Sequence, residues 1–520
     1  MRLDGIALAI ELAAARMVSM SPADVRDRLG DRFRLLSGSR RGLERHQTLR
    51  HAVAWSYDLL GDDERVVLNR CAVFADGFDL ASATHICGDG FDEYVLLDHL
   101  DSLVRKSLMT VGRVGGHARY AMLETIRQYA EDQLGASGTS DQVRDRHARF
   151  FAVEAQRHYT VWEGPRQPDA YAWLDVELAN LRAAFRWSAD AGDVDTAATI
   201  AAATALVGAV AHVFEPSAWA EELLEAAQAR QLRMLPWLYC GAASCMYLGR
   251  ADDAVRYADA SLALLDDLRF DPLPVGFGYP ALSLGTAHLM AGVPERFLAN
   301  AAAVIARDGD TTGFVRAGMA WTLASLGRFD EAASVLDGAV EAAEQSGIPA
   351  VIAYTLYAYG TTHAHAHPQE ALAAKRRALD IARRSGSRMV AAMVTRELAG
   401  MEARFGDTYR ALDLFDETID SVHQTGTLSH LGATFAELAI HLERVGLVAA
   451  AATMYGAAIR DARSAAIFAR RPELPDRLRQ TLGLSAFDQN RAVGTAMTAT
   501  EAVRYAHGQI VAARTLIEPA

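Results

Sequence analysis

The chain has 520 residues, of which 51% are hydrophobic, so it is long enough to bury substantial cores in about three domains. Its 65 acidic residues outnumber the 52 basic ones, and the net charge of −13 argues against strong attraction of the whole molecule to nucleic-acid phosphates or anionic membranes. The four cysteines lack the spacing of a disulfide framework or a zinc site. We therefore expect a cytoplasmic protein with reduced thiols and no bound metal.

The first helix that the sequence predicts is apolar on all sides. Only Glu11 and Arg16 interrupt residues 5–18, so this segment requires burial all round. A secretory signal does not fit, because Asp4 precedes the apolar run and Glu11 lies inside it. We expect that the segment which buries this helix belongs upstream of Met1.

Residues 51–140 carry the pattern of a winged-helix domain. Residues 108–123 alternate around Gly115 and Gly116, which predicts a hairpin, and residues 123–134 return to a helical pattern. Before the hairpin, helical periodicity is found in residues 46–60, 62–74, 79–87 and 92–107. Helices followed by a two-stranded hairpin form a winged helix.

The predicted recognition helix of this domain is acidic. It carries Asp92, Glu93, Asp98 and Asp101 before its two basic residues, and residues 51–100 hold ten acidic residues against two arginines. Such a helix repels a phosphate backbone. The basic residues between Arg32 and Arg50 could compensate, although a charged linker needs no ligand. We expect no direct binding of DNA.

Residues 196–214 form an uncharged stretch that is nominally long enough to span a bilayer. They are mainly alanine with several threonines and a histidine, so their transfer into lipid gains little. We expect a buried helix of a repeat array here and no contact with a membrane.

A helical-hairpin repeat occupies most of the remaining chain. Each repeat starts with a small residue, which is followed by a glycine seven positions on, an alanine five positions after the glycine and a second small residue seven positions after the alanine. Four copies of this pattern begin at Ala242, Ala320, Ala399 and Ala439. With two degenerate copies, the turns fall at residues 249, 292, 327, 366, 406 and 446, and a weaker copy has its turn at residue 192. We expect each glycine to end a helix in the left-handed conformation. The spacing resembles the tetratricopeptide repeat, whose concave surface binds proteins or peptides.

Two short segments imitate functional motifs, a Walker B strand and a metal site, but their positions in the repeats argue against both. Residues 261–267 imitate a Walker B strand, but they close the second helix of a repeat. The histidines at 363, 365 and 367 imitate a metal site, but alternate residues share a face only on a strand, and this stretch falls at a helix end and turn. We expect neither site.

Four segments together resemble a known family. They are GIALAIELAAARM, RFRLLSGSRRGLERHQTLRHAVAWSYDLL, SLVRKSLM and RYAMLETIRQYAEDQL. They are similar to the C-terminal half of the nucleotide-binding domain in bacterial signal-transduction ATPases with numerous domains, the STAND group related to NB-ARC proteins. Glu177–Trp187 resembles the link into the helical repeats of that family. Its members commonly carry an N-terminal effector or a C-terminal LuxR-type DNA reader.

The resemblance implies that two motifs which contact the nucleotide in the family are present here in altered form. The Gly-Leu-Pro-Leu-Ala motif corresponds to residues 5–9, with Ala7 at its proline, and the Met-His-Asp signature corresponds to residues 122–124. The leucine in the second motif cannot donate a hydrogen bond to a phosphate. We interpret the matching residues as vestigial nucleotide-contact positions: Gly5, Ala7, Leu8, Leu123 and Glu124.

The chain has only two lysines, Lys106 and Lys375, and neither follows the glycine-rich loop that holds a nucleotide's phosphates. We therefore expect no ATPase activity, no catalytic residues and no cofactor. ATP or ADP would bind only if an upstream nucleotide-binding half were supplied.

The sequence predicts a mainly α protein, a helical and winged-helix module followed by a solenoid of TPR-like repeats. The expected divisions are a nucleotide-domain (ARC) remnant at 1–50, the winged helix at 51–140, a linker with a degenerate repeat at 141–230, repeats at 231–465 and a helical tail at 466–520. Two functions fit. One is a non-enzymatic regulatory scaffold, a truncated transcription regulator acting through protein–protein contacts of the array. The other is the sensory half of an ATP-switch, LuxR-like regulator whose nucleotide-binding half is supplied upstream or by a separate chain.

Overall fold

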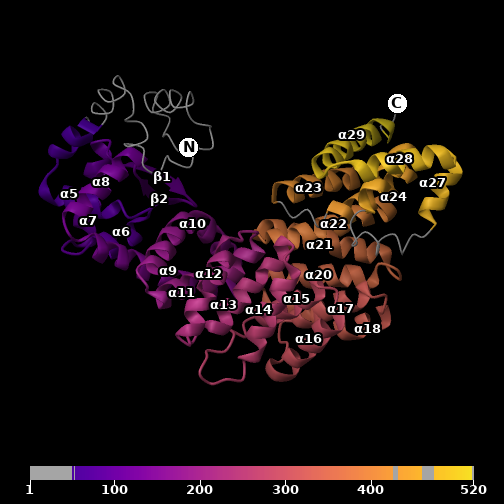
Figure 1. Ribbon diagram of the computed structural model, residues 1–520, viewed down its shortest axis with the longest axis horizontal. Helices are drawn as coiled ribbons and strands as arrows, with labels where there is room; N and C mark the ends of the chain where they lie inside the picture. The colour runs from indigo at the N-terminus through magenta and orange to yellow at the C-terminus, as the bar shows by residue number, and fades with distance from the viewer. Residues whose placement is uncertain (1–49, 52, 426–430, 460–472, 518–520) are drawn as a thin grey trace. The chain divides into compact units, whose positions relative to one another are not determined.

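The computed structural model describes residues 50–51, 53–425, 431–459 and 473–517 (Figure 1). The described residues are mainly helical and contain one two-stranded sheet. They group into two compact units, Met1–Ala155 with Val176–Ile200 and Gln156–Asp175 with Ala201–Ala520. The N-terminal apolar segment, with Gly5, Ala7 and Leu8, lies outside the described residues, and the domain boundaries expected from the sequence stay a prediction.

The first unit contains the winged helix that the sequence predicts. Asp79 and Asp92 begin two of its helices, because each carboxylate accepts a hydrogen bond from a backbone amide three residues on. Its elements are α5 (Asp62–Cys71), α6 (Leu80–Cys87), α7 (Glu93–Arg105), β1 (Thr110–Val114), β2 (His117–Ala121) and α8 (Glu124–Ala136).

The turn of the hairpin lies at the two glycines from which the sequence predicts it. Gly115 and Gly116 have φ of 58° and 86°, and β1 pairs with β2 antiparallel from Thr110↔Ala121 to Val114↔His117. Tyr120 of β2 also forms an isolated bridge with Phe78, whose ring stacks on Phe74 with centroids 4.3 Å apart. The hairpin is therefore attached to the helices through a buried aromatic core.

Helix α10 (Gln167–Asp190) holds the winged helix through side chains of the Glu177–Trp187 segment. Glu177 forms a buried ion pair with Arg119 of β2. Asn180 accepts a hydrogen bond from the Ala75 amide and donates one to the Gly77 carbonyl, both at 2.8 Å. The segment thus fixes the strand and the loop before α6 to the part of α10 that belongs to the same unit.

The repeats are helix pairs, as the sequence predicts, and they follow α9 (Ser140–Trp162) and α10. The tail at residues 474–517 is helical too. The elements are α11 (Val194–Val210), α12 (Glu215–Ala229), α13 (Leu235–Ala242), the 3-10 helix η2 (Ala243–Leu248), α14 (Ala251–Ala263), α15 (Tyr279–Met290), α16 (Pro294–Asp308), α17 (Phe314–Ser325), α18 (Phe329–Leu336), α19 (Ala339–Ser346), α20 (Pro349–His363), α21 (Pro368–Ser385), α22 (Arg388–Phe405), α23 (Thr408–Thr425), α24 (Leu431–Arg444), α25 (Val448–Ala458), α27 (Leu474–Leu482), α28 (Leu484–Ala496) and α29 (Ala499–Ile517).

The prediction that each turn glycine is left-handed is wrong at one repeat. The glycines at 192, 249, 292, 327 and 446 have φ between 76° and 90°, but Gly406 has φ −125° and ψ −136°. A Cβ on Gly406 would lie 2.0 Å from an Oε atom of buried Glu402, which accepts a hydrogen bond from the Asp407 amide. A side chain at this position would therefore have to displace the Glu402 carboxylate.

Two helices of the repeats are interrupted where the pattern predicts continuous ones. The helix leading to the turn at Gly249 changes from α to 3-10 geometry at Ala243. The helix that follows the turn at Gly327, α18, ends at Leu336, and α19 continues after a break, because Gly338 has a φ of 67°. The spacing of small residues therefore fixes the hairpin but not the continuity of its helices.

Long-range contacts join segments of the second unit that lie far apart in sequence. Gln167, at the start of α10, accepts a hydrogen bond at 2.9 Å from the amide of Ala350, the second residue of α20. Arg388, at the start of α22, binds the Asp175 carboxylate and donates to the Ala211 carbonyl at 3.1 Å. In an open solenoid each repeat contacts only its neighbours. These contacts instead bring segments more than 170 residues apart in sequence to the same surface.

Helix α11 covers most of the uncharged stretch and is almost wholly buried, as the sequence predicts. Among the described residues, no helix combines the length and the hydropathy needed to cross a lipid bilayer.

Candidate functional site: a pocket inside the repeat array

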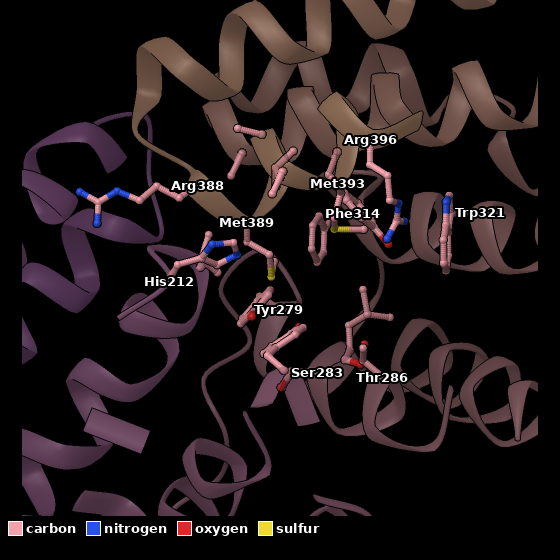
Figure 2. A pocket seen from close by; sticks show the side chains of 18 of the residues that line it. His212, Tyr279, Ser283, Thr286, Phe314, Trp321, Arg388, Met389, Met393 and Arg396 are labelled. Carbon is pink, nitrogen blue, oxygen red and sulfur yellow. The ribbon is translucent and has the colours of Figure 1, made fainter. Parts of the chain in front are cut away.

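A pocket of about 510 Å³ lies among the helices of the repeats (Figure 2). Its walls come from α15, α17, α20 and α22, with further residues from the end of α9 and from the segment after α11. The volume falls within the range of about 300–1,000 Å³ that is typical of sites for small molecules. All the lining residues belong to the second compact unit.

Aromatic rings form one wall of the pocket. Trp162 contacts Tyr279 edge to face with centroids 5.4 Å apart, and Phe314 contacts Phe277 at 5.2 Å and Tyr354 at 5.0 Å. Such ring pairs fix each other's orientation beyond what apolar burial requires. The wall is therefore shaped in advance rather than assembled around a ligand.

Gly278 explains how two of these rings reach the wall. It precedes α15 with a φ of 90°, and a Cβ there would lie 2.7 Å from a methyl group of Val315. Only glycine combines this backbone conformation with such close packing. The turn places Phe277 before α15 and Tyr279 at its first position, and both rings line the pocket.

Helix α22 forms another part of the lining. Met389, Met393 and Arg396 follow one another at four- and three-residue intervals, which places them on one face of a helix. In Figure 2 the guanidinium of Arg396 extends between Met393 and Trp321. The flexible methionines suit contact with ligands of varied shape.

The neutral polar groups of the pocket include His212 and Tyr279. Burial first, and then Arg388, lower the pKa of His212 to about 4, so its ring is uncharged near neutral pH. Burial and the neighbouring Tyr247 raise the pKa of Tyr279 well above its usual value, which keeps its hydroxyl protonated. Two further hydroxyls, of Ser283 and Thr286, donate to carbonyls of their own helix.

Three charged residues line the pocket, Arg388, Arg396 and Glu417. Arg388 binds Asp175, and Glu417 binds Arg383. Arg396 is half-buried.

Behind Trp321 lies a buried polar network centred on Glu397, the residue that follows Arg396. Glu397 accepts hydrogen bonds from Tyr357, Thr361 and the ammonium group of Lys375, and the Trp321 indole nitrogen lies 3.5 Å from its carboxylate. The ammonium group also lies 4.4 Å from the centre of the Tyr357 ring. The pocket wall and this network therefore share Trp321.

Both lysines of the chain have structural partners. Lys106, the residue that caps α7, binds Glu64 of α5, and Lys375 of α21 binds Glu397 of α22. Each lies on or directly after a helix rather than at a glycine-rich loop. This placement agrees with the sequence argument that neither belongs to a phosphate loop.

The two described positions of the vestigial nucleotide motif lie at the start of α8. Leu123 precedes the helix and is 38% exposed. Glu124 pairs with Arg127 at 2.8 Å, and Arg127 also donates to the Ala72 carbonyl. These contacts fasten α8 to the end of α5. That the positions are vestigial nucleotide contacts stays a prediction.

The segment that imitates a Walker B strand and the three histidines that imitate a metal site lie in helices and turns of the repeats. Ser261 belongs to α14 and donates a hydrogen bond to a carbonyl of α13. His363 ends α20 and His367 precedes α21, with His365 in the turn. Within the described part of the chain, no group of three or more histidine, cysteine, aspartate or glutamate residues could hold a metal ion.

Sequence reasoning missed the pocket. Its residues are scattered from 162 to 418, and the repeat template emphasises the small residues at helix contacts rather than the large ones that face inward. A usable signal was present in the three aromatic residues beside Gly278 and Gly313, because large rings next to turn glycines do not serve the turn.

The comparisons with known proteins identify one domain. Residues 60–135 match the winged helix-turn-helix domain family. The match covers α5 to all but the last residue of α8, so the fold built above from helices and hairpin agrees with it.

Curated relatives match parts of the chain. "Putative HTH-type transcriptional regulator Rv0890c" of Mycobacterium tuberculosis is 41% identical over 227 residues, which are 43% of this chain and 26% of that protein. "Uncharacterized protein Rv0894" of the same species is 44% identical over 151 residues, 28% of this chain and 38% of that protein. The chain thus spans about a quarter of the regulator's length.

Among solved structures, a signal transduction ATPase with numerous domains (STAND) protein with a tetratricopeptide repeat sensor, PH0952 from Pyrococcus horikoshii, aligns with 94% of this chain and 74% of its own. The TM-score is 0.38 and the sequence identity is 14%.

Proposed function

We propose that this chain is a non-enzymatic regulatory module of a transcription regulator. In this proposal the repeat array receives a signal, and the chain passes it on through protein–protein contacts. One observation carries the proposal: a winged helix-turn-helix domain of the kind found in transcription regulators shares a chain with a repeat array that contains a ligand-sized pocket. The regulators among the relatives support the regulatory role.

The acidic recognition helix supports a role in contacts with protein rather than with DNA. Helix α7 begins with Asp92 and Glu93, and its basic residue Lys106 is engaged with Glu64. A helix of this charge presents no row of cations to phosphates. We therefore expect the winged helix to bind another part of the regulator, with a protein or peptide as the partner of the array.

A second candidate function is the sensory half of an ATP switch whose nucleotide-binding half is supplied upstream or by a separate chain. The observation that favours it is apolar surface in the winged-helix unit. Trp55, Leu59 and Tyr94 are 69%, 64% and 80% exposed within the described structure. Large exposed apolar side chains on one module suit contact with a further domain.

The regulatory proposal is tested by transcript levels. A strain of the source organism that lacks this gene should show a defined set of altered transcripts, and the wild-type gene supplied on a plasmid should restore them. A complementing gene with Ala392→Trp, which fills the pocket, should restore expression of the chain but not the signal-dependent change. Unaltered transcripts in the deletion strain under all growth conditions would contradict the proposal.

A further inference from the structure

We propose that the pocket binds a small, neutral, mostly apolar ring compound that carries one hydrogen-bonding oxygen, such as an aromatic ketone or alcohol. The inference rests on the proposed function, since it names the chemical class of the signal that the array receives. Three observations carry it: the burial of the lining residues, the engagement of their charged groups and a buried hydroxyl that lacks a hydrogen-bond partner.

The burial of the lining favours a small molecule over a peptide. Trp162, Phe277, Phe314 and Met389 come from four separate segments, and each is at most 9% exposed. A peptide that runs along a surface groove needs exposed side chains on its path, whereas these side chains line a space of about 510 Å³ within one compact unit. A space of this size accepts a compact molecule of a few rings.

The side chains of the lining favour an apolar ring as the body of the ligand. The rings of Trp162, Tyr279, Phe314 and Tyr354 and the methionines of α22 line the same space. An aromatic ligand packs edge to face or offset on such rings, and its ring edges contact thioether sulfur. A sugar or a nucleotide would leave most of its hydroxyl and phosphate groups without partners there.

The charged groups of the lining favour a neutral ligand. Arg388 and Glu417 each have an ion-pair partner within the protein. Arg396 is engaged within the protein too, and its charge lowers the pKa of Glu397. A charged ligand would lose its hydration without gaining a counter-ion from this lining. We therefore assign no contact with the ligand to these three charges.

The hydroxyl of Tyr279 provides the contact for the oxygen of the ligand. Tyr279 is 5% exposed and lines the pocket (Figure 2), and no group in the described part of the chain forms a hydrogen bond with its hydroxyl. Tyr247 raises the pKa of Tyr279, but the two hydroxyls do not meet the geometry of a hydrogen bond. The hydroxyls of Ser283 and Thr286, in contrast, already donate to carbonyls of their own helix. A buried hydroxyl without a partner costs free energy, and a ligand oxygen bound to it recovers that cost.

Trp321 offers a route for the signal. It lines the pocket, and its indole nitrogen lies 3.5 Å from the carboxylate of Glu397. Glu397 of α22 also accepts hydrogen bonds from Tyr357 of α20 and Lys375 of α21. A ligand that packs on Trp321 therefore acts on a network that joins three successive helices of the array.

The test uses the purified full chain and three matched probes: the ketone 2-acetylnaphthalene, the hydrocarbon 2-ethylnaphthalene and the anion 2-naphthoate. They share one ring system and differ in a neutral oxygen, no oxygen and a charged carboxylate. Competition against a fluorescent naphthyl ketone, 6-propionyl-2-(dimethylamino)naphthalene, measures the affinity of each probe. We expect micromolar binding of the ketone and binding of the anion that is weaker by about tenfold or more, because its charge finds no counter-ion.

Two tyrosine variants test the hydrogen bond. Tyr279→Phe should weaken binding of the ketone by about three- to tenfold and change that of the hydrocarbon less than twofold, because only the ketone loses a hydrogen bond. Its thermal stability should be unchanged or higher than that of the wild type, because the lost hydroxyl has no partner. Tyr159→Phe is the matched control, since Tyr159 is buried but lies outside the lining, and it should change neither affinity.

Two further variants test the pocket. Ala392→Trp and Met393→Trp should each abolish binding of all three probes by filling the space that these residues line. Thermal unfolding shows whether each variant is folded, and one that fails to fold is replaced by the other.

Four results would overturn the inference. Binding of the anion as tight as that of the ketone rejects the neutral class, and absence of binding by every probe rejects the ligand altogether. Unchanged binding by both pocket-filling variants rejects the pocket. An effect of Tyr279→Phe that is equal for ketone and hydrocarbon, or a loss of stability in this variant, rejects the hydroxyl contact.

The regulatory proposal is judged separately by the transcripts of the deletion strain. Altered transcripts without probe binding would leave the regulator and reject this ligand, whereas probe binding without altered transcripts would do the reverse.

Discussion

Lys375 and Glu397 form an ion pair in which the lysine side chain is 1% exposed, and this pair joins α21 to α22 directly behind the pocket wall. Lys375 also donates to Thr361 of α20 at 2.9 Å. One of the only two lysines in the chain therefore serves to hold three helices together rather than to bind a phosphate.

Breaking this pair should destabilise the array strongly. Lys375→Met leaves the Glu397 carboxylate without its ammonium partner, and we expect the free energy of unfolding in urea to fall by about 3 kcal/mol or more. The double variant Lys375→Met with Glu397→Met should recover much of the loss, since neither charge is then buried alone. A double variant no more stable than Lys375→Met would contradict this account.

Stability should fall in acid as two carboxylates are protonated. Burial raises the pKa of Glu397, but Lys375, Arg396 and Tyr357 outweigh this effect and lower the pKa from 4.5 to about 2. Burial also raises the pKa of Glu64, but Lys106, Ser102 and the Gly61 amide outweigh it and lower that pKa from 4.5 to about 2. A depressed pKa gives stability that is complete above the unfolded value of 4.5 and is lost as the pH falls toward 2.

Urea unfolding between pH 6 and pH 3 checks this dependence. Glu397→Gln should be less stable than the wild type at pH 6, and the difference should shrink toward pH 3, because the wild-type carboxylate gains a proton on unfolding there. Glu64→Gln provides the same comparison in the winged-helix unit. Differences that stay constant across this pH range would show that the carboxylates contribute no linked stability.

Gly360 should tolerate no side chain. A Cβ there would lie 2.6 Å from Cγ of Lys375 and 2.9 Å from the Ala371 carbonyl, so Gly360→Ala should cost about 1–3 kcal/mol through overpacking between α20 and α21. Gly508→Ala is the matched control in α29, because nothing lies within 4 Å of its Cβ position. It should stabilise the helix by about 0.5–1 kcal/mol. Equal effects of the two variants in thermal unfolding would contradict the packing argument.

The purified chain should not bind ATP or ADP with useful affinity. Both lysines are held by glutamates, and Glu124 of the vestigial motif pairs with Arg127. A nucleotide's phosphates need a cradle of backbone amides and a positioned lysine. Isothermal titration calorimetry with magnesium and either nucleotide should show no heat of binding. Micromolar binding would revive the family contacts at Leu123 and Glu124.

The sequence by itself determined the local elements and their order. Gly115 and Gly116 predicted the hairpin, Asp79 and Asp92 mark helix starts, and the small residues around Gly249, Gly327 and Gly446 predicted the helix pairs. Each of these signals depends on residues close in sequence, where backbone conformation and helix periodicity decide the outcome.

The tertiary structure decided everything that depends on which repeats meet across the inner surface. Gly406 looked like a left-handed turn and instead makes room for the carboxylate of Glu402. The contact of Arg388 with Asp175 joins residues 213 positions apart, and no periodic pattern records such a pairing. The pocket, the position of Arg396 beside Trp321 and the partner of Lys375 depend on how successive helix pairs pack on one another, which is not encoded in any single repeat.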